Sequence, residues 1–174
     1  MAGELDEFDI KILQTLARDG RITWTDLADA IGLSLTPTLK RVRRLEADGY
    51  IAGYQATIDE TRVGRAMSVF ISVSLSTQTD AVLARFESSI RDIPEIMSCF
   101  MMTGETDYAL RIVVPDLTAY RAFISALTQI PGVSRVTTSF AVKAVIQRSA
   151  PPLPAKLKKP HRESRQLKAG AAKR

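Results

Sequence analysis

The alternation of side chains between residues 66 and 75 constrains the fold of this chain more than any other feature. Apolar Val69, Ile71 and Val73 alternate there with Phe70 and with small serines. Because successive side chains of a strand point to opposite faces, a period of two predicts a strand with one buried face. The residues that follow predict a helix over 79–91, strands over 96–103 and 108–114, a helix over 116–130, and a strand over 133–146.

These elements follow the order β-α-β-β-α-β, which is typical of a ferredoxin-like domain. Two helices cover only one face of a four-stranded sheet, so the other face stays uncovered. We place Phe70, Met101 and Phe140 on that uncovered face. Apolar residues on an uncovered face predict a partner, most simply a second copy of the chain.

Three short helical patterns occupy the first sixty residues. Asp6, Thr23 and Ser34 are expected N-caps, because their side-chain oxygens can accept the unpaired backbone N–H groups of a first turn. Two short helices joined by a turn at Gly32 predict a helix-turn-helix. A short strand and linker are expected from Tyr50 onward. The expected bounds are 7–18, 23–31 and 34–48 for the helices and 50–58 for the strand and linker.

The third of these helices has an apolar stripe and a basic stripe on nearly opposite faces. At about 100° per residue, Lys40, Arg43 and Arg44 gather near Thr36, whereas three leucines and Val42 lie on the far side. A recognition helix needs this arrangement, because one face docks on its domain and the other presents donors to phosphates and base edges. The predicted DNA contacts are Thr36, Thr38, Lys40, Arg41, Arg43 and Arg44.

Two of these contacts have an alternative of equal weight. Thr38 also suits packing at the edge of the core, and Arg41 also suits an internal salt bridge with Glu46 or Asp48. For the whole basic stripe, the plain alternative is a solvated helix with scattered surface charge. The preceding capped helix and its glycine turn favour DNA binding over that alternative.

Charge is unevenly distributed along the chain. The formal net charge is +5, yet residues 1–62 carry a net charge of −3 and residues 63–148 a net charge of +1. Residues 149–174 carry 8 basic side chains and one acid, so this tail supplies the whole excess. Its proline-rich start and its few large apolar residues predict disorder, and its charge predicts added nonspecific affinity for DNA. We expect domains over 1–60 and 61–148, followed by the tail.

Several classes of protein and site are excluded by what the sequence lacks. It has no run of 18 apolar residues, so no transmembrane helix is expected, and its acidic N-terminus does not resemble a signal peptide. Cys99 and His161 are the single cysteine and histidine, which disfavours a disulfide framework, a metal centre and a Ser-His-Asp triad. We expect no enzyme, no cofactor and no membrane contact, and a cytoplasmic location in which Cys99 is an inert thiol.

Nine short motifs follow one another along residues 4–148. They are Leu5-Asp6-x-x-Asp9, Asp19-Gly20-Arg21, Leu27-Ala28, Gly32-Leu33-Ser34, Thr36-Pro37, Arg41-Val42-x-x-Leu45-Glu46, Gly49-Tyr50-Ile51, Thr103-Gly104-x-x-Asp107-Tyr108 and Pro131-Gly132-Val133. In order and spacing these motifs resemble the Lrp/AsnC family of transcription regulators, and the tail is not part of that pattern.

The resemblance implies an α+β chain, with an N-terminal helix-turn-helix domain and a C-terminal ferredoxin-like βαββαβ domain that senses amino acids. It implies dimers formed through the sheets, and further assembly into tetramers or octamers. It also implies an amino-acid effector between subunits, near the loop from Thr103 to Asp107. The predicted effector residues are Met101, Gly104, Asp107, Thr137 and Ser139.

Gly104 and Asp107 also have a chemical reason to bind an amino acid. A glycine lets backbone N–H groups approach a carboxylate closely, and an aspartate can accept hydrogen bonds from an α-ammonium group. The alternative is a plain turn, since both residue types favour turns.

The sequence therefore predicts a transcription regulator that binds double-stranded DNA and copies of itself and responds to an amino acid. Two symmetric helix-turn-helix units would read half-sites about 34 Å apart. The alternative is a nucleoid-type architectural protein of low sequence specificity, which the basic tail favours. A third hypothesis, an enzyme or a regulatory subunit of metabolism that binds amino acids, lacks a catalytic set of residues.

Overall fold

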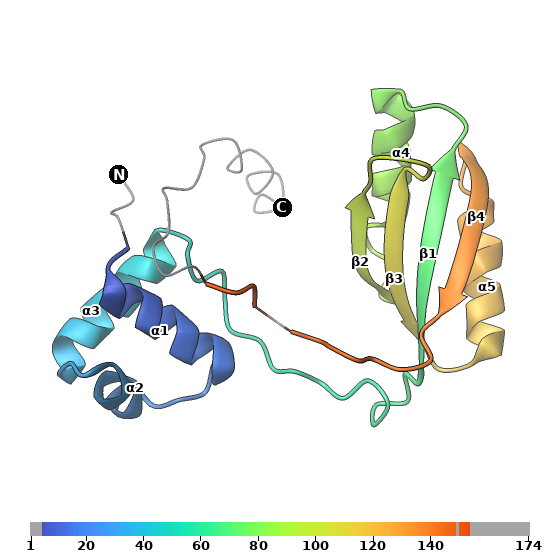
Figure 1. Cartoon of the computed structure of the whole chain (residues 1–174). Coiled ribbons are helices and arrows are strands. Elements are labelled where there is room, and N and C mark those ends of the chain that lie inside the picture. The colour runs from blue at the N-terminus through green and yellow to red at the C-terminus, as the bar shows by residue number, and fades with distance from the viewer. Residues whose placement is uncertain (1–4, 149, 154–174) are drawn as a thin grey trace. The chain divides into compact units, whose positions relative to one another are not determined.

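The computed structural model describes residues 5–148 and 150–153, which form two compact units. The helical unit contains the described residues up to Ala56 and those from 147 to 153, and the sheet unit runs from Thr57 to Ile146. The helical unit consists of α1 (Glu7–Arg18), α2 (Trp24–Ile31) and α3 (Leu35–Ala47) (Figure 1). These helices confirm the three helical patterns of the sequence.

Local capping fixes where the first two helices begin and end. The side chain of Asp6 accepts from the backbone N–H of Asp9, and the side chain of Asp9 accepts from that of Asp6. This reciprocal capping box satisfies two otherwise unpaired donors. Thr23 caps α2 by accepting from the backbone N–H of Asp26. Gly32 ends α2 with a φ of 76°, a left-handed conformation that glycine adopts without strain.

Two expectations for the helical unit are wrong. Ser34 precedes α3, but its side chain makes no capping hydrogen bond. A cap bonds to the second or third N–H of the helix, and the third residue of α3 is Pro37, which has no N–H. Residues 50–58 contain no strand. The strand formers there lack a neighbouring strand, without which an extended segment gains no ladder.

Apolar side chains from all three helices form the core of the helical unit. Ile12 of α1, Leu27 of α2 and Leu45 of α3 are each fully buried. Since α3 buries only one of its faces in this core, its opposite face is left for solvent or a ligand.

The sheet unit has the predicted βαββαβ order. Its strands pair only antiparallel in the order β2-β3-β1-β4, and both helices lie on one face of the sheet (Figure 1). Val69, Ile71 and Val73 of β1 are buried between the sheet and the helices, as their alternation predicts. The elements are β1 (Met67–Leu75), α4 (Asp80–Ile90), β2 (Ile96–Met101), β3 (Tyr108–Val114), α5 (Leu117–Thr128) and β4 (Val133–Phe140).

Strand register corrects the face assigned to two apolar residues, because paired residues of neighbouring strands share a face. Phe70 lies on the uncovered face and is 51% exposed, as expected. Phe140 pairs with a buried residue of β1, and its ring centroid lies 4.9 Å from that of Tyr120 on α5. Met101 pairs with buried Tyr108. Phe140 and Met101 therefore lie on the helix side, not on the uncovered face.

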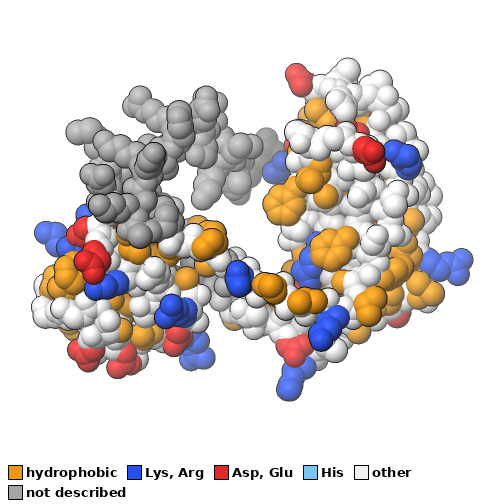
Figure 2. Space-filling model, viewed as in Figure 1, with side chains coloured by type: hydrophobic (Ala, Val, Ile, Leu, Met, Phe, Trp, Pro, Cys, Tyr) orange, Lys and Arg blue, Asp and Glu red, His pale blue; other side chains and the backbone are white. Residues whose placement is uncertain are grey.

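The uncovered face combines apolar side chains with hydroxyl groups, and Figure 2 shows hydrophobic side chains gathered on it. Phe70 and Phe100 are its large exposed apolar residues. By register, the face also carries Ser68, Ser72, Ser98, Ala109, Arg111, Thr137 and Ser139.

The last strand ends earlier than the sequence predicts. It stops at Phe140, and Ala141 makes one further backbone hydrogen bond to Ser68 at the start of β1. Because β1 begins at Met67, later residues have no strand to pair with, and residues 141–148 are exposed. The single histidine and the predicted disordered tail, apart from residues 150–153, lie outside the described residues. No helix within the described residues is long and apolar enough to cross a membrane.

Candidate nucleic-acid interface and effector site

The solvent-facing side of α3 carries three of the six residues predicted to contact DNA. Thr36, Lys40 and Arg43 are all exposed. They stand at positions i, i+4 and i+7 of the helix, so they form one stripe over two turns. The stripe follows directly from the docking of the other face of α3 on the core of the helical unit. It presents one hydroxyl group and two cations to a ligand.

Thr38 does not belong to this stripe, and the prediction that it contacts DNA is wrong. Its side chain is fully buried, and its hydroxyl donates to the carbonyl oxygen of Ser34 at 2.9 Å. A buried hydroxyl with a partner inside its own helix has no access to a phosphate. The alternative given for Thr38, packing at the core, is the one the structure shows.

Arg41 points toward α1 instead of solvent. Its Nη1 donates to Asp6 at 2.6 Å and to Asp9 at 2.9 Å, and its guanidinium lies 5.5 Å from the ring centroid of Phe8. The expected internal salt bridge is present, but its partners differ from the predicted Glu46 and Asp48. Acids of α1 come closer because the two helices pack side by side.

Arg44 is also engaged by α1, although the helical wheel placed it beside Lys40. Its Nη2 donates to Asp9, and its side chain remains 41% exposed. The basic stripe of the sequence thus divides into two parts. Lys40 and Arg43 form no ion pair with a described residue, whereas Arg41 and Arg44 are paired.

Asp9 is the centre of this ion cluster, and the sequence analysis did not single it out as a partner of these arginines. Its side chain is fully buried, with 0% of its surface exposed. It accepts hydrogen bonds from the backbone N–H of Asp6, from Arg41 and from Arg44. A signal was present in the sequence. Asp9 stands three and four residues before Ile12 and Leu13, so it lies on the face of α1 that packs inward.

This ion cluster changes the acidity of its members. Burial opposes ionisation of Asp6, but hydrogen bonds from the backbone of Asp9 and from Arg41 outweigh it and lower the pKa of the Asp6 carboxyl. Burial also opposes the charge of Arg41, and its hydrogen bonds to both aspartates prevail and raise the pKa of the guanidinium. Both groups are therefore charged at neutral pH and hold α1 against α3.

Asp107 is braced within its own unit, where each of its carboxylate oxygens already accepts a hydrogen bond. It is 9% exposed, and its two oxygens accept from the backbone N–H of Leu75 and from the side-chain amide of Gln78, each at 2.6 Å. These contacts give Asp107 the turn role named as its alternative, and its contact with an effector stays a prediction. Asp107 ties the start of β3 to the loop that follows β1.

The other predicted effector residues are not brought together within one chain. Met101 and Gly104 lie at the end of β2 and in the turn after it, whereas Thr137 and Ser139 lie on β4. β2 and β4 are the two opposite edges of the sheet, about 14 Å apart at the usual strand spacing. Gly104 has a φ of 121° and open space around it, so its backbone is accessible.

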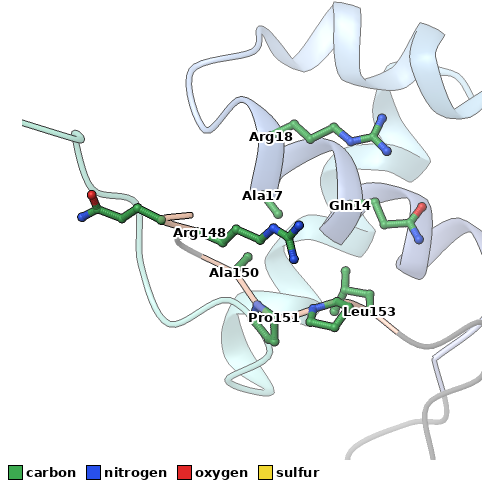
Figure 3. Close-up of a pocket in the computed structure, with 9 residues that line it drawn as sticks. Gln14, Ala17, Arg18, Arg148, Ala150, Pro151 and Leu153 are labelled. Atoms are coloured by element: carbon green, nitrogen blue, oxygen red, sulfur yellow. The ribbon is translucent and has the colours of Figure 1, made fainter. Parts of the chain in front are cut away.

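Two open hollows lie in the helical unit, and neither includes a predicted effector residue. One is formed by Gln14, Ala17 and Arg18 of α1 and by residues 147, 148 and 150–153, which lie against this helix (Figure 3). The other lies between Trp24 and Tyr54. In the part of the chain that the structure describes, no group of three or more His, Cys, Asp or Glu side chains could hold a metal ion.

Cys99 of β2 is half-buried on the face of the sheet that the helices cover. Burial and the nearby carboxylate of Glu87 raise the pKa of its thiol to about 11, so it is protonated at neutral pH. Because the thiolate is the reactive form, this supports the expectation of an inert thiol.

Two family models match the chain, one over the helical unit and the other over most of the sheet unit and a few residues beyond it. Residues 5–52 match a winged helix-turn-helix DNA-binding domain, and residues 68–151 match the Lrp/AsnC ligand binding domain. The chain belongs to the Lrp/AsnC family. Members of the Lrp/AsnC family that match it are transcriptional regulators, which confirms the expected family and excludes the enzyme hypothesis.

Curated Lrp/AsnC relatives resemble the chain over most of its length. It is 61% identical over 151 residues to the Bkd operon transcriptional regulator of Pseudomonas aeruginosa, covering 86% of this chain and 99% of that protein. It is 37% identical over 145 residues to the leucine-responsive regulatory protein of Escherichia coli, covering 83% and 88%.

Solved Lrp/AsnC structures share its fold. A transcriptional regulator of Neisseria meningitidis in complex with L-Met has a TM-score of 0.82 and 36% identity, covering 85% of this chain and 96% of that one. An AsnC family regulator of Agrobacterium tumefaciens has a TM-score of 0.81 and 33% identity, covering 85% and 97%.

Proposed function

We propose that this chain is a sequence-specific regulator of transcription that reads the major groove of DNA with the exposed stripe Thr36, Lys40 and Arg43. The observation that carries this proposal is the orientation of α3, which docks one face on its unit and presents these three side chains to solvent. Arg43 can engage a guanine edge with two hydrogen bonds, and Lys40 can neutralise a phosphate. Such a regulator acts in the cytoplasm of a bacterial cell.

A small effector, an amino acid, controls the oligomeric state or the DNA affinity of the chain. Support comes from the match to a ligand-binding domain and from the L-Met complex of the Neisseria regulator. The effector site forms between subunits, with Met101 and Gly104 from one chain and Thr137 and Ser139 from another. Opposite sheet edges cannot meet within one chain, which favours this shared site. Asp107 shapes the loop, and no other cofactor is involved.

The uncovered face of the sheet binds a second copy of the chain. Phe70 and Phe100 offer apolar area, and the charge of Arg111 on this face is already neutralised by Glu60 at 2.6 Å. Neutralising Arg111 lowers the desolvation cost of burying the centre of this face, which favours a stable dimer. By register, exposed Arg135 also lies on this face, near the end of β4. Tetramers and octamers would form by further contacts between dimers.

Selection from a random pool of duplexes with the full chain tests sequence-specific binding. We expect enrichment of two-fold symmetric sequences whose half-sites lie about 10 base pairs apart. A chain with Lys40→Ala and Arg43→Ala should enrich no sequence, whereas Arg121→Ala, which removes an exposed arginine of α5, should behave as the wild type. Enrichment of the same sequences by the double variant would overturn the assignment of α3.

A thermal-shift screen of the twenty amino acids with the full chain tests the effector. We expect one or a few amino acids to raise the melting temperature, and Thr137→Val to abolish the shift because it removes one hydroxyl at nearly constant volume. Thr118→Val on α5 is the matched control and should keep the full shift. A shift that Thr137→Val leaves intact would remove this residue from the site.

An architectural protein that wraps DNA with little sequence preference is the second candidate. The observation that favours it is the charge of residues 149–174, which carry 8 basic side chains and one acid. Competition with unrelated duplex decides between the two functions. A ratio of specific to nonspecific affinity near one supports the architectural protein, and a ratio of 10³ or more supports the regulator.

A further inference from the structure

We propose that Asp9 determines the DNA specificity of this chain by withholding Arg41 and Arg44 of the recognition helix from phosphates. This inference rests on the proposed DNA binding and deepens it. It assigns a role to a residue of α1, a helix that presents no side chain to the proposed DNA-reading stripe. Asp9 is a positioning residue, since it acts on DNA only through the arginines it holds.

The geometry of Asp9 leaves its charge no partner other than these arginines. Its side chain is 0% exposed, so it cannot be neutralised by solvent ions. One oxygen accepts from Arg41 at 2.9 Å, and the other accepts from Arg44 and from the backbone N–H of Asp6 at 3.0 Å. A buried carboxylate held in this way keeps its partners in place, because separating them would leave a buried charge unpaired.

The two arginines differ in how firmly they are held. Arg41 also donates to Asp6 and lies against the ring of Phe8, and its side chain is 27% exposed. Arg44 has Asp9 as its ion-pair partner within the described residues and is 41% exposed. Arg44 is therefore the cation that a loss of Asp9 would release toward the solvent-facing stripe.

Withholding a cation changes specificity because phosphates carry no sequence information. Every released guanidinium that reaches a phosphate strengthens binding to all sequences equally, whereas base contacts strengthen binding to one. With Arg41 and Arg44 held by α1, the stripe reduces to Thr36, Lys40 and Arg43. Binding to the correct sequence then depends on few phosphate contacts and more on base contacts.

The test measures affinity for an unrelated 30-base-pair duplex as a function of salt, with the full chain and four variants. The slope of log affinity against log salt changes by about 0.9 for each phosphate contact. We expect Asp9→Asn to steepen the slope by about 0.9 for each α3, Arg44→Gln to leave it unchanged, and Arg44→Gln in the Asp9→Asn chain to return it to the wild-type value. Glu7→Gln is the matched control.

The Glu7→Gln control separates the proposed role from a simple change in charge. Glu7 lies on the same helix and pairs with Lys11 at 2.8 Å on the surface, so its variant alters net charge by the same amount and also frees a cation. We expect the slope of this variant to equal that of the wild type. Equal steepening by Glu7→Gln and Asp9→Asn would overturn the proposal.

Arg44→Gln and one further variant, Arg43→Gln, keep the proposal testable if Asp9→Asn does not fold. Arg44→Gln alone must leave the wild-type slope unchanged, while Arg43→Gln must flatten it by about 0.9. A flattening by Arg44→Gln as large as that by Arg43→Gln would overturn the withholding of Arg44. If Arg43→Gln also has no effect, the proposed reading of DNA by α3 has failed instead. Circular dichroism of every variant establishes that it is folded.

Discussion

Asp9 in the helical unit and Asp107 in the sheet unit are both buried aspartates that join elements distant in sequence. The carboxylate of Asp9 accepts from the guanidinium groups of Arg41 and Arg44, so charge is matched by charge. The carboxylate of Asp107 accepts from a backbone N–H and from the neutral amide of Gln78. One is an ion cluster between two helices, and the other is a carboxylate that accepts from uncharged donors at the end of β1 and in the loop after it.

Asp9 therefore balances the charge of arginines on α3, whereas Asp107 fixes the conformation of a turn. Removing Asp9 leaves Arg44 without its ion-pair partner, and Arg41 with Asp6 alone, on the helix that we propose reads DNA. Removing Asp107 leaves only neutral donors without an acceptor, and so it loosens a turn. Variants of Asp9 should therefore change both stability and DNA binding, whereas variants of Asp107 should change the stability of the sheet unit.

The largest effect should follow from Asp9→Ala, which breaks the ion cluster. Loss of this buried carboxylate costs about 2 to 3 kcal/mol in the free energy of unfolding, because Arg41, Arg44 and the backbone N–H of Asp6 all lose an acceptor. Urea denaturation followed by the emission of Trp24, the single tryptophan, reports on the helical unit. Glu7→Ala removes an exposed pair and should cost less than about 1 kcal/mol. Similar losses in both variants would contradict the role given to burial.

Asp107→Ala should have the next largest effect, about 2 kcal/mol, because the N–H of Leu75 and the amide of Gln78 lose their acceptor. Asp107→Asn keeps one oxygen as an acceptor and should lose less. Urea denaturation followed by far-ultraviolet circular dichroism measures the loss. The transition reported by Trp24 should not move, and a shift of that transition would show that the brace also supports the helical unit.

Glu60→Gln should have a smaller effect, about 1 kcal/mol, on the sheet unit. Its two oxygens accept from Nη2 of Arg111, and both side chains are partly exposed, which screens the pair. Arg62→Gln provides the control, since Arg62 pairs with Asp59 on the surface. We expect no measurable loss from the control in the same denaturation assay. A larger loss from Arg62→Gln would contradict the ranking by burial.

The smallest expected effect is the loss of stability of the helical unit at acidic pH. The pKa of Asp6 is lowered in the folded chain from its ordinary value of 3.8, so its contribution to stability is complete above that value and is lost as the pH falls below it. The Trp24 transition should therefore weaken from pH 5 to pH 2, and Asp6→Asn should weaken less over the same range. An equal pH dependence in both chains would show that Asp6 does not contribute.

Local signals allowed the helices of this chain to be predicted well. Asp6, Thr23 and Gly32 mark helix ends through contacts within a few residues, and the structure places them as expected. The burial of Thr38 could also be predicted from the sequence. Thr38 lies about 200° from Thr36 on the helical wheel, which is within the apolar stripe.

Contacts between distant elements could not be predicted in the same way. The wheel shows where Arg41 and Arg44 point, but not that Asp9, more than thirty residues earlier, stands there. Likewise, the alternation of β4 gives two faces, but only its register against β1 decides that Phe140 lies on the helix side. Both outcomes depend on packing that no local pattern contains.

The operator affinities of Arg43→Gln and Arg44→Gln, measured side by side on the duplex selected by the wild type, give the most direct measurement. Loss of a base contact costs about 1–3 kcal/mol, so Arg43→Gln should weaken binding roughly tenfold or more, while Arg44→Gln should weaken it less than about twofold. Equal losses, or a larger loss from Arg44→Gln, would contradict the division of α3 into a stripe that reads DNA and arginines held by α1.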